Sequence, residues 1–420
     1  MDFEPSARAA DLAARVRTFV DTEIAPVEDE YHRRIAEIRD SGGDPWQPLP
    51  LVDGLRAEAR LRGLWNLWLP AGHEGPYAKR YGTDAGAGLS NVDYAPVAEQ
   101  MGRSLLAPLV FNCNAPDTGN MEVLLRYGTA EQRDQWLDPL LDGTIRSGFA
   151  MTEPDVASSD ATTMAATAVI DGDEVVINGR KWWTTGAGHP DCAVFVLMAR
   201  TDDPAADRHH QHTMVLVPRD TPGVEVVRML PAMGRYDEPL GHGEVLFSNV
   251  RVPASNILLG RGRAFEIAQG RLGPGRVHHC MRLVGLAEHA LELAIARGKE
   301  RVAFGKPLID LGGNRERIAR ARIAIDSTRL LVLNAAWKLD RSGPLGALSE
   351  VSQIKVAAPS MAQQVIDFAM QLHGGAGLSD DVPLAAAWTQ ARALRLADGP
   401  DEVHLGLVAR IEIARHAARR

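Results

Sequence analysis

The spacing of apolar side chains changes character twice along the chain. Up to about residue 147, apolar positions recur at helical spacing, as in the Ala- and Leu-rich stretch 9–20. From about 148 to 258, short apolar runs alternate with Gly, Pro and Asp, which is typical of β-strands joined by turns. Helical spacing returns after Gly275, where the apolar residues between Leu283 and Ala294 fall on one stripe. The pattern predicts helices, then strands, then helices.

Local signals predict the individual elements. Thr129 to Gln132 has the form of a capping box that opens a helix. An Asp171-Gly172 turn joins two apolar strands, and Asn178-Gly179 predicts a second turn into the segment 181–185. We expect further strands over 193–199, 213–217, 224–227 and 244–247, helices over 315–339, 348–373, 384–396 and 401–415, and loops over 41–50 and 70–88.

These patterns predict an α+β protein of three parts. The chain has 420 residues, more than one domain usually holds, and its 45% hydrophobic content is ample for a large core. Long helices joined by short turns are typical of a helix bundle. We therefore expect an N-terminal helical domain over 1–147, a middle β domain over 148–262 and a C-terminal helix bundle over 263–420.

Composition narrows the class of protein. The formal net charge of −8 argues against a nucleic-acid binder. Three widely spaced cysteines without a CxxC pair fit a reducing compartment and predict no zinc or iron–sulfur site. The acidic N-terminus lacks the features of a signal peptide, and no run reaches about 18 apolar residues, so we expect a cytoplasmic protein with no membrane span.

Two segments of the middle region carry hydroxyls and aromatic rings. If the strand at 181–185 alternates regularly, Trp183 and Thr185 share one face, where an indole can stack on a planar ring and a hydroxyl can bond its edge. The alternative is a Trp that fills the β core. The polar turn that begins at Thr152 offers N–H groups and hydroxyls to carbonyl or phosphate oxygens, or is a generic turn.

The C-terminal region offers other candidates, each with a simpler alternative. The glycine cluster 374–377 follows a helix and not a strand, so it is a helix cap or a close approach to a ligand, and it is no dinucleotide fingerprint. Arg301 and Phe304 lie just past a helix end, where a solvated terminus is the alternative. The His-rich segment 209–212 indicates a surface loop more than a metal site. Asp398, on a short break between helices, is placed to act as a base.

Taken together, these segments resemble the acyl-CoA dehydrogenase family. The likeness spans nearly the whole chain, and its end resembles the branch that contains the C-terminal domains of multidomain long- and branched-chain acyl-CoA dehydrogenases. The matching segments occur in the expected order: 149–160, 181–185, 301–306, 371–377 and 398–403.

The resemblance implies an FAD site and roles for particular residues. On one subunit the flavin would contact Met151, Thr152, Ser158 or Ser159 (the loop length leaves the register open), Trp183 and Thr185. Pro400 and Glu402 are further implied flavin contacts. A neighbouring subunit of a homodimer or homotetramer would add Arg301, Phe304, Gln371, Gly374 and Gly375. Arg276 and Gly399 would meet the acyl-CoA thioester. An electron-transfer flavoprotein is the implied acceptor.

Two departures from the family pattern bear on catalysis. The usual glutamine after Phe-Gly-Lys-Pro-Leu is replaced by the stretch 311–313, and the usual catalytic glutamate is Asp398. The other position that carries a base in some members is Gly275 here, which leaves Asp398 as the predicted α-proton base. We expect burial beside an apolar acyl chain to raise its pKa.

Two other functions remain open from the sequence. One is a flavin oxidase of the same superfamily, for instance one acting on nitroalkanes, in which an aspartate base is also known. The other is a flavoprotein that binds acyl-CoA without turnover.

Overall fold

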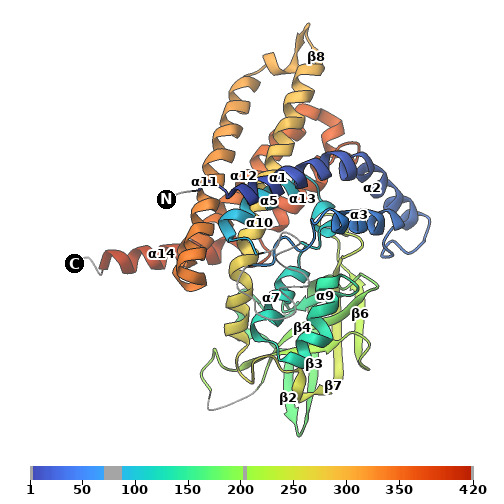
Figure 1. Ribbon diagram of the computed structural model, residues 1–420, viewed down its shortest axis with the longest axis vertical. Helices are drawn as coiled ribbons and strands as arrows, with labels where there is room; N and C mark the ends of the chain where they lie inside the picture. The colour runs from blue at the N-terminus through green and yellow to red at the C-terminus, as the bar shows by residue number, and fades with distance from the viewer. Residues whose placement is uncertain (1–2, 71–87, 202–205, 418–420) are drawn as a thin grey trace.

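The computed structural model describes residues 3–70, 88–201 and 206–417, so nearly all of the loop expected over 70–88 lies outside the described residues. The three regions are those expected: helices at the N-terminus, a β region in the middle and long helices at the C-terminus (Figure 1). The α+β class is therefore confirmed. The limits of the three domains stay a prediction.

Short helices make up the N-terminal region. The capping box at Thr129 is confirmed, because its Oγ1 accepts a hydrogen bond from the N–H of Gln132 at 3.2 Å and its own N–H donates to Gln132 Oε1 at 3.0 Å. The helices are α1 (Ala7–Phe19), α2 (Ala25–Asp40), α3 (Pro50–Leu61), α5 (Asn91–Met101), α6 (Ala107–Val110), α7 (Asp117–Tyr127), α8 (Ala130–Gln132) and α9 (Asp138–Asp142), with π-helical turns at Val20–Ile24 and Arg133–Leu137.

The middle region is a seven-stranded sheet with strand order β1-β4-β2-β3-β7-β6, and β5 pairs with β4. Its strands are β1 (Arg146–Ala150), β2 (Thr167–Asp171), β3 (Glu174–Thr185), β4 (Cys192–Arg200), β5 (His212–Pro218), β6 (Val224–Met229) and β7 (His242–Pro253). Strands β2 and β3 pair in antiparallel fashion around the Asp171-Gly172 turn, as expected.

The prediction of a second turn at Asn178-Gly179 is wrong. Strand β3 continues through it, and its pairing with β7 shifts register between Ile177 and Gly179. Gly179 has φ 148°, and a Cβ there would lie 2.4 Å from the Cβ of Ala166. The glycine therefore serves a bulge and a close contact inside one long strand.

Long helices form the C-terminal region. Helix α10 begins before Gly275 and not after it as expected, and α11 has a break at Gly343 (φ 66°, ψ −178°), near the expected end of that helix. The elements are α10 (Ala264–Glu300), α11 (Asn314–Gly346), α12 (Leu348–His373), α13 (Leu384–Ala393), α14 (Asp401–Ala417) and the small hairpin of β8 (Val302–Ala303) and β9 (Lys306–Pro307).

Two glycines bring α5 and α10 into backbone contact. A Cβ on Gly285 of α10 would lie 1.7 Å from the carbonyl oxygen of Glu99, and a Cβ on Gly102 would lie 2.0 Å from that of Arg282. Since real side chains do not approach so closely, both positions require glycine. One hydrophobic core runs through the N-terminal and C-terminal helices and takes in side chains of β4 and β5, and a second lies within the β region.

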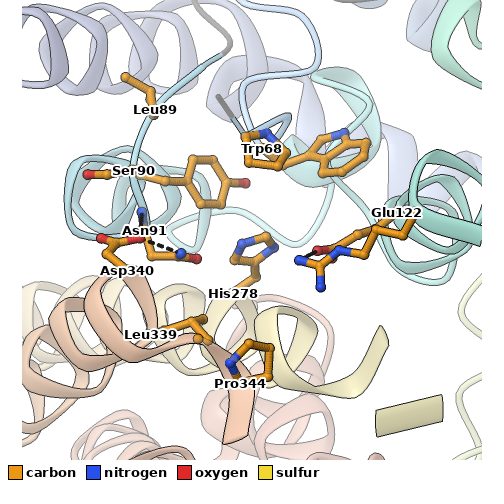
Figure 2. A pocket seen from close by; sticks show the side chains of 13 residues that line it. Trp68, Leu89, Ser90, Asn91, Glu122, His278, Leu339, Asp340 and Pro344 are labelled. Atoms are coloured by element: carbon orange, nitrogen blue, oxygen red, sulfur yellow. Dashed lines mark hydrogen bonds and ion pairs between the residues drawn. The ribbon is translucent and has the colours of Figure 1, made fainter. Parts of the chain in front are cut away.

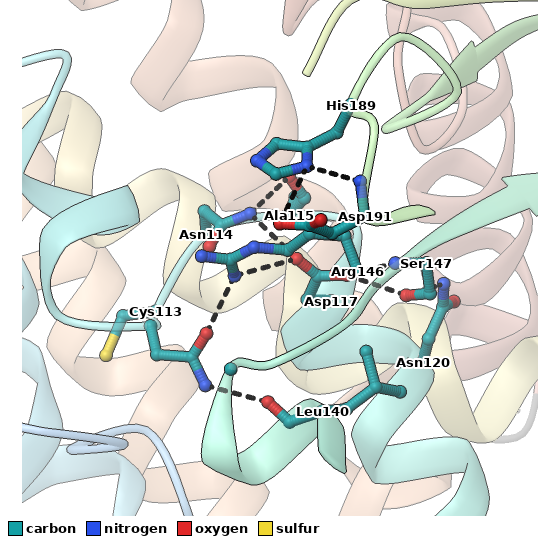
Figure 3. Close-up of polar contacts among 12 residues, drawn as sticks. Cys113, Asn114, Ala115, Asp117, Asn120, Leu140, Arg146, Ser147, His189 and Asp191 are labelled. Atoms are coloured by element: carbon teal, nitrogen blue, oxygen red, sulfur yellow. Dashed lines mark hydrogen bonds and ion pairs between the residues drawn. The ribbon is translucent and has the colours of Figure 1, made fainter. Parts of the chain in front are cut away.

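A buried polar network fixes α7 against β1 (Figure 3). Arg146 donates to Asn112 Oδ1 at 2.8 Å and lies 3.2 Å from the carboxylate of Asp117, which also accepts from the N–H and Oγ of Ser147. Asn120 Nδ2 donates to Ser147 Oγ at 2.9 Å. Because buried charges are costly unless paired, this network holds the start of α7 in one position.

Candidate active site

A large cleft of about 1980 Å³ lies where the three regions meet. Its walls come from α2, α7, α10, β3, β7 and the break between α13 and α14. Its volume exceeds that of a site for one drug-sized molecule, so it has room for extended ligands. Ten of the residues predicted for the site line it: Met151, Thr152, Ser158, Ser159, Trp183, Thr185, Arg276, Asp398, Gly399 and Pro400.

Six predicted residues do not line this cleft. Phe304 is 94% exposed in the small β8–β9 hairpin, at the top of the view in Figure 1. Arg301, at the end of α10, and Glu402, in the first turn of α14, are exposed. The others, Gln371, Gly374 and Gly375, lie where α12 ends. One chain by itself does not bring these residues to the cleft, and their predicted roles stay predictions.

Trp183 presents its ring to the cleft. Its side chain is 41% exposed, so the alternative of a Trp filling the β core is wrong. Regular alternation also fails here, because Trp183 has φ 52° and the pairing with β7 shifts between Lys181 and Thr184. Thr185 lines the same cleft, and its Oγ1 lies 3.0 Å from Nδ1 of His242.

A buried lysine fixes the segment that carries Thr152. Lys181 Nζ donates to the carbonyl of Met151 at 2.8 Å and to the carboxylate of Glu153 at 2.7 Å. Burial lowers the pKa of Lys181 to about 8, while Glu153 opposes this shift. The N–H of Trp182 donates to the Thr152 carbonyl at 2.9 Å. Thr152 therefore faces the cleft from a rigid backbone.

The two serines of the following loop differ in their bonding. Ser158 Oγ accepts the N–H of Glu153 at 2.9 Å, so this hydroxyl already closes the turn. Ser159 is exposed at the cleft. Of the two, Ser159 has the hydroxyl better placed for a ligand.

Asp398 lies in a backbone conformation fixed from two sides. It has φ 58°, a left-handed value that Asp and Asn tolerate better than most residues. Its carbonyl accepts a hydrogen bond from Arg276 Nε at 3.0 Å, and Nε2 of His404 lies 3.3 Å from the same oxygen. Its side chain is 20% exposed and lines the cleft.

The expected rise in the pKa of Asp398 is wrong for this chain. Burial does raise the pKa, but the groups around the carboxylate outweigh it and hold the pKa below its ordinary value. These groups are His279, Arg271, Lys355 and Arg276. Burial and Arg282 lower the pKa of His279 itself to about 3, so at neutral pH the positive charge comes from the arginines and the lysine. Asp398 is an ionised carboxylate, as a base must be.

Sequence reasoning missed the residues of α10 that surround Asp398. Arg271, His279 and Arg282 all line the cleft, and they recur with Gly275 at helical spacing. The guanidinium of Arg271 lies 3.8 Å from the ring centre of Phe149. Because the stretch before Gly275 was not expected to be helical, this shared face was not visible in the sequence.

A smaller cavity of about 260 Å³ lies beside His278, which also lines the large cleft (Figure 2). His278 packs edge-on against Tyr94 with ring centres 4.8 Å apart. Burial raises the pKa of Glu122 to about 7, against the opposing effect of Arg126. The adjacent residues His278 and His279 both line the large cleft, and His278 also lines this smaller cavity.

The described part of the chain shows neither a metal site nor a helix that could span a membrane. Within residues 3–70, 88–201 and 206–417, no group of three or more His, Cys, Asp or Glu side chains is arranged to hold a metal ion. His210 instead lies 2.7 Å from the carboxylate of Asp207. No helix of the described chain is both long and apolar enough to cross a bilayer.

Family models of the acyl-CoA dehydrogenases match nearly the whole chain. The N-terminal domain model matches residues 6–144, the middle domain model 148–250 and the C-terminal domain model 262–412. The chain belongs to the acyl-CoA dehydrogenase family.

Particular relatives agree with this assignment. A solved structure of a putative acyl-CoA dehydrogenase from Mycobacterium abscessus is 65% identical with a TM-score of 0.93, over 98% of this chain and 100% of that one. The probable acyl-CoA dehydrogenase FadE2 of Mycobacterium tuberculosis is 49% identical over 418 residues, covering 99% of this chain and 98% of that protein.

Other curated relatives are much longer than this chain. Acyl-CoA dehydrogenase family member 10 of Mus musculus is 53% identical over 395 residues, which are 94% of this chain and 36% of that protein. The chain spans about half or less of the length of such relatives.

Proposed function

We propose that this chain is an FAD-dependent acyl-CoA dehydrogenase that converts an acyl-CoA thioester to the trans-2-enoyl-CoA. The observation that carries the proposal is the placement of the Asp398 carboxylate in the cleft that Trp183 and Thr152 also line. A carboxylate base and a wall on which a flavin ring could lie, in one cleft, suit the removal of a proton and a hydride from adjacent carbons.

The cofactor part of the proposal rests on the chemistry of the cleft wall. An exposed indole at Trp183, hydroxyls at Thr152 and Thr185 and a rigid backbone at Met151 suit a flat ring with a hydrogen-bonding edge. Bound FAD would supply the hydride acceptor. Ser159 would meet a phosphate or the pantetheine, because Ser158 is already engaged in the turn.

Asp398 would take the α-proton. The Cα–H bond breaks, the proton passes to the carboxylate, and the electron pair left on Cα forms the double bond as the hydride leaves Cβ. The side chain of Asp398 is shorter than that of the glutamate usual in the family. The hydrogen bond from Arg276 to the Asp398 carbonyl fixes the backbone from which this side chain would reach the substrate. Gly399, with φ 103°, turns the chain so that the thioester can approach.

Assembly and electron transfer complete the proposal. Arg301, Phe304, Gln371, Gly374 and Gly375 lie away from their own chain's cleft, which supports a homo-oligomer in which they complete a neighbour's FAD site. An electron-transfer flavoprotein would reoxidise the flavin.

The first test is the flavin itself. The purified protein should be yellow, release FAD on heating, and lose its absorbance near 450 nm when mixed anaerobically with an acyl-CoA of suitable chain length. A panel of chain lengths is needed because the described residues do not fix the acyl group. Release of FMN, or of no flavin, would contradict the cofactor assignment.

The same assay separates the other functions. Rapid reoxidation of the reduced flavin by O₂ would identify an oxidase. Tight acyl-CoA binding without flavin reduction at any chain length would identify a binding protein.

A further inference from the structure

His279 of α10 lies beside the carboxylate of Asp398, and the resemblance to the acyl-CoA dehydrogenases assigns it no role. Its Nε2 lies 3.6 Å from Oδ2 of Asp398, and its side chain is 15% exposed. On the other side of the ring, Nδ1 lies 3.1 Å from a terminal nitrogen of Arg282. One imidazole thus joins a carboxylate at the cleft to a guanidinium behind it.

Arg282 decides which ring nitrogen carries the proton. A guanidinium can only donate hydrogen bonds, so Nδ1 of His279 must accept and carries no hydrogen. The other terminal nitrogen of Arg282 donates to the carbonyl of Cys113 at 3.2 Å, which fixes the guanidinium in place. A neutral His279 therefore has its hydrogen on Nε2, the nitrogen that faces Asp398.

The surrounding charges keep the ring neutral. The charged groups that face it are Arg271 and Arg282 on α10, Lys355 on α12, and Asp398. Burial and Arg282 lower the pKa of His279 to about 3, although Asp398 acts in the opposite direction. A second proton would have to sit on Nδ1, against the N–H of Arg282, so geometry and charge agree.

The carboxylate of Asp398 needs a group that orients it. The hydrogen bonds from Arg276 and His404 go to its backbone carbonyl and not to its carboxylate. A separation of 3.6 Å is long for a hydrogen bond, but contacts of this kind shorten when a substrate fills the site. A misplacement of about 1 Å can lower a rate by about 100-fold.

We propose that His279 is a positioning residue for Asp398: Arg282 holds its neutral ring with the hydrogen on Nε2, and this N–H directs the carboxylate towards the α-carbon of the substrate. This inference rests on the proposed function, because it assigns a partner to the base of that reaction. His279 itself exchanges no proton with the substrate.

The test compares His279→Leu with His279→Gln in the FAD-bound protein. The leucine removes the N–H, whereas the glutamine places an amide N–H near the former Nε2 and a carbonyl oxygen towards Arg282. Stopped-flow flavin reduction by a good acyl-CoA should slow by about 10- to 100-fold in His279→Leu, with little change in the substrate concentration for half-maximal rate. His279→Gln should recover most of the rate.

The pH profile distinguishes positioning from support of the fold. A donor to a carboxylate favours its charged form, so its loss raises the pKa of Asp398. The acid limb of the reduction rate should therefore move to higher pH in His279→Leu and return in His279→Gln. His416→Leu is the control, because His416 is exposed in the last turn of α14 and does not line the cleft. It should keep the wild-type profile.

The outcomes separate this inference from the proposed function. If no acyl-CoA reduces the wild-type flavin, the proposed function fails, and the role of His279 fails with it. If the wild type is active and a folded, FAD-bound His279→Leu reduces its flavin at the wild-type rate and pH, the inference alone fails. A slow His279→Leu with an unshifted profile and no recovery in His279→Gln would also overturn it, since that result indicates a role in packing only.

Discussion

At the scale of single residues, the sequence identifies Asp398 but not the charged groups that surround it. The position of Asp398 follows from its place in the chain, but the sign of its pKa shift does not, because Arg271, Arg276 and Lys355 come from distant segments. The expectation of a raised pKa considered burial alone. The three-dimensional placement of these cations reverses it.

Asp398→Asn is the substitution best suited to test the base. Asparagine keeps the size of the side chain and tolerates the left-handed φ of 58°. FAD should therefore stay bound, while flavin reduction by acyl-CoA falls by about 100-fold or more. Retention of the wild-type bleaching rate would remove Asp398 from the mechanism.

Asp398→Glu tests whether the backbone is adjusted to the shorter side chain. The hydrogen bond from Arg276 fixes the loop, so an added methylene would push the carboxylate beyond its working position. We expect slower flavin reduction than in the wild type. A faster reaction in stopped-flow measurements would show that the loop adapts freely.

His278 should contribute to sensitivity towards acid. Burial lowers its pKa from the ordinary 6.5 to about 3, so between these values the unfolded chain binds a proton that the folded chain does not. Stability is therefore lost as pH falls below about 6.5, by about 1.4 kcal/mol per pH unit from this residue. His278→Phe keeps an aromatic ring against Tyr94 and removes the titration.

The measurement is the unfolding temperature of both proteins from pH 7.5 to 4.5. The His278→Phe variant should lose less stability than the wild type as the pH falls. Parallel curves would show that His278 does not set this dependence.

At the scale of elements, the apolar pattern predicted helices better than it predicted their interruptions. Helix α12 has the bounds expected, 348–373, because one apolar face runs its whole length. Glycine was the source of error. Gly179 was interpreted as a turn and is a bulge next to Ala166, and Gly270 lies inside α10, where a Cβ would meet the hydroxyl of Tyr127 at 2.1 Å. Packing partners that cannot be identified from the sequence require glycine at both positions.

Gly285→Ala should test the contact between α5 and α10. The new methyl group would collide with the carbonyl oxygen of Glu99, and backbone cannot move aside as a side chain does. We expect a loss of about 3 kcal/mol in stability, measured by denaturant unfolding. The control is Gly54→Ala in α3, where a Cβ meets nothing within 4 Å, and a gain of up to about 1 kcal/mol is expected. Equal stability of the two variants would contradict the close crossing.

At the scale of the whole molecule, the order of the three regions could be predicted because each has its own periodicity. A division of the site between two chains leaves no such periodic pattern in the sequence. The resemblance implied that Arg301 acts in a neighbour's site, and in its own chain Arg301 lies outside the cleft.

Arg301→Ala should therefore loosen FAD without unfolding the chain. The ratio of flavin to protein after gel filtration should fall while the circular dichroism stays unchanged. Arg320→Ala is the control, since Arg320 is an exposed residue of α11 paired with Glu316. A monomer that keeps one FAD per chain would overturn the shared site.

The contact of Gly102 and Gly285 also affects how such chains can recombine. The two positions lie in regions far apart in the sequence, yet Gly102 leaves room only for the backbone at Arg282, and Gly285 only for the backbone at Glu99. A chimaera that takes its first region from one homologue and its last from another would need a helix pair with the same spacing. The β region has no part in this contact and has a second core of its own, although side chains of β4 and β5 also pack into the core of the helices. We therefore expect exchange of the middle segment between homologues to be tolerated more readily than exchange of either end, so that the two helical regions are inherited as one unit.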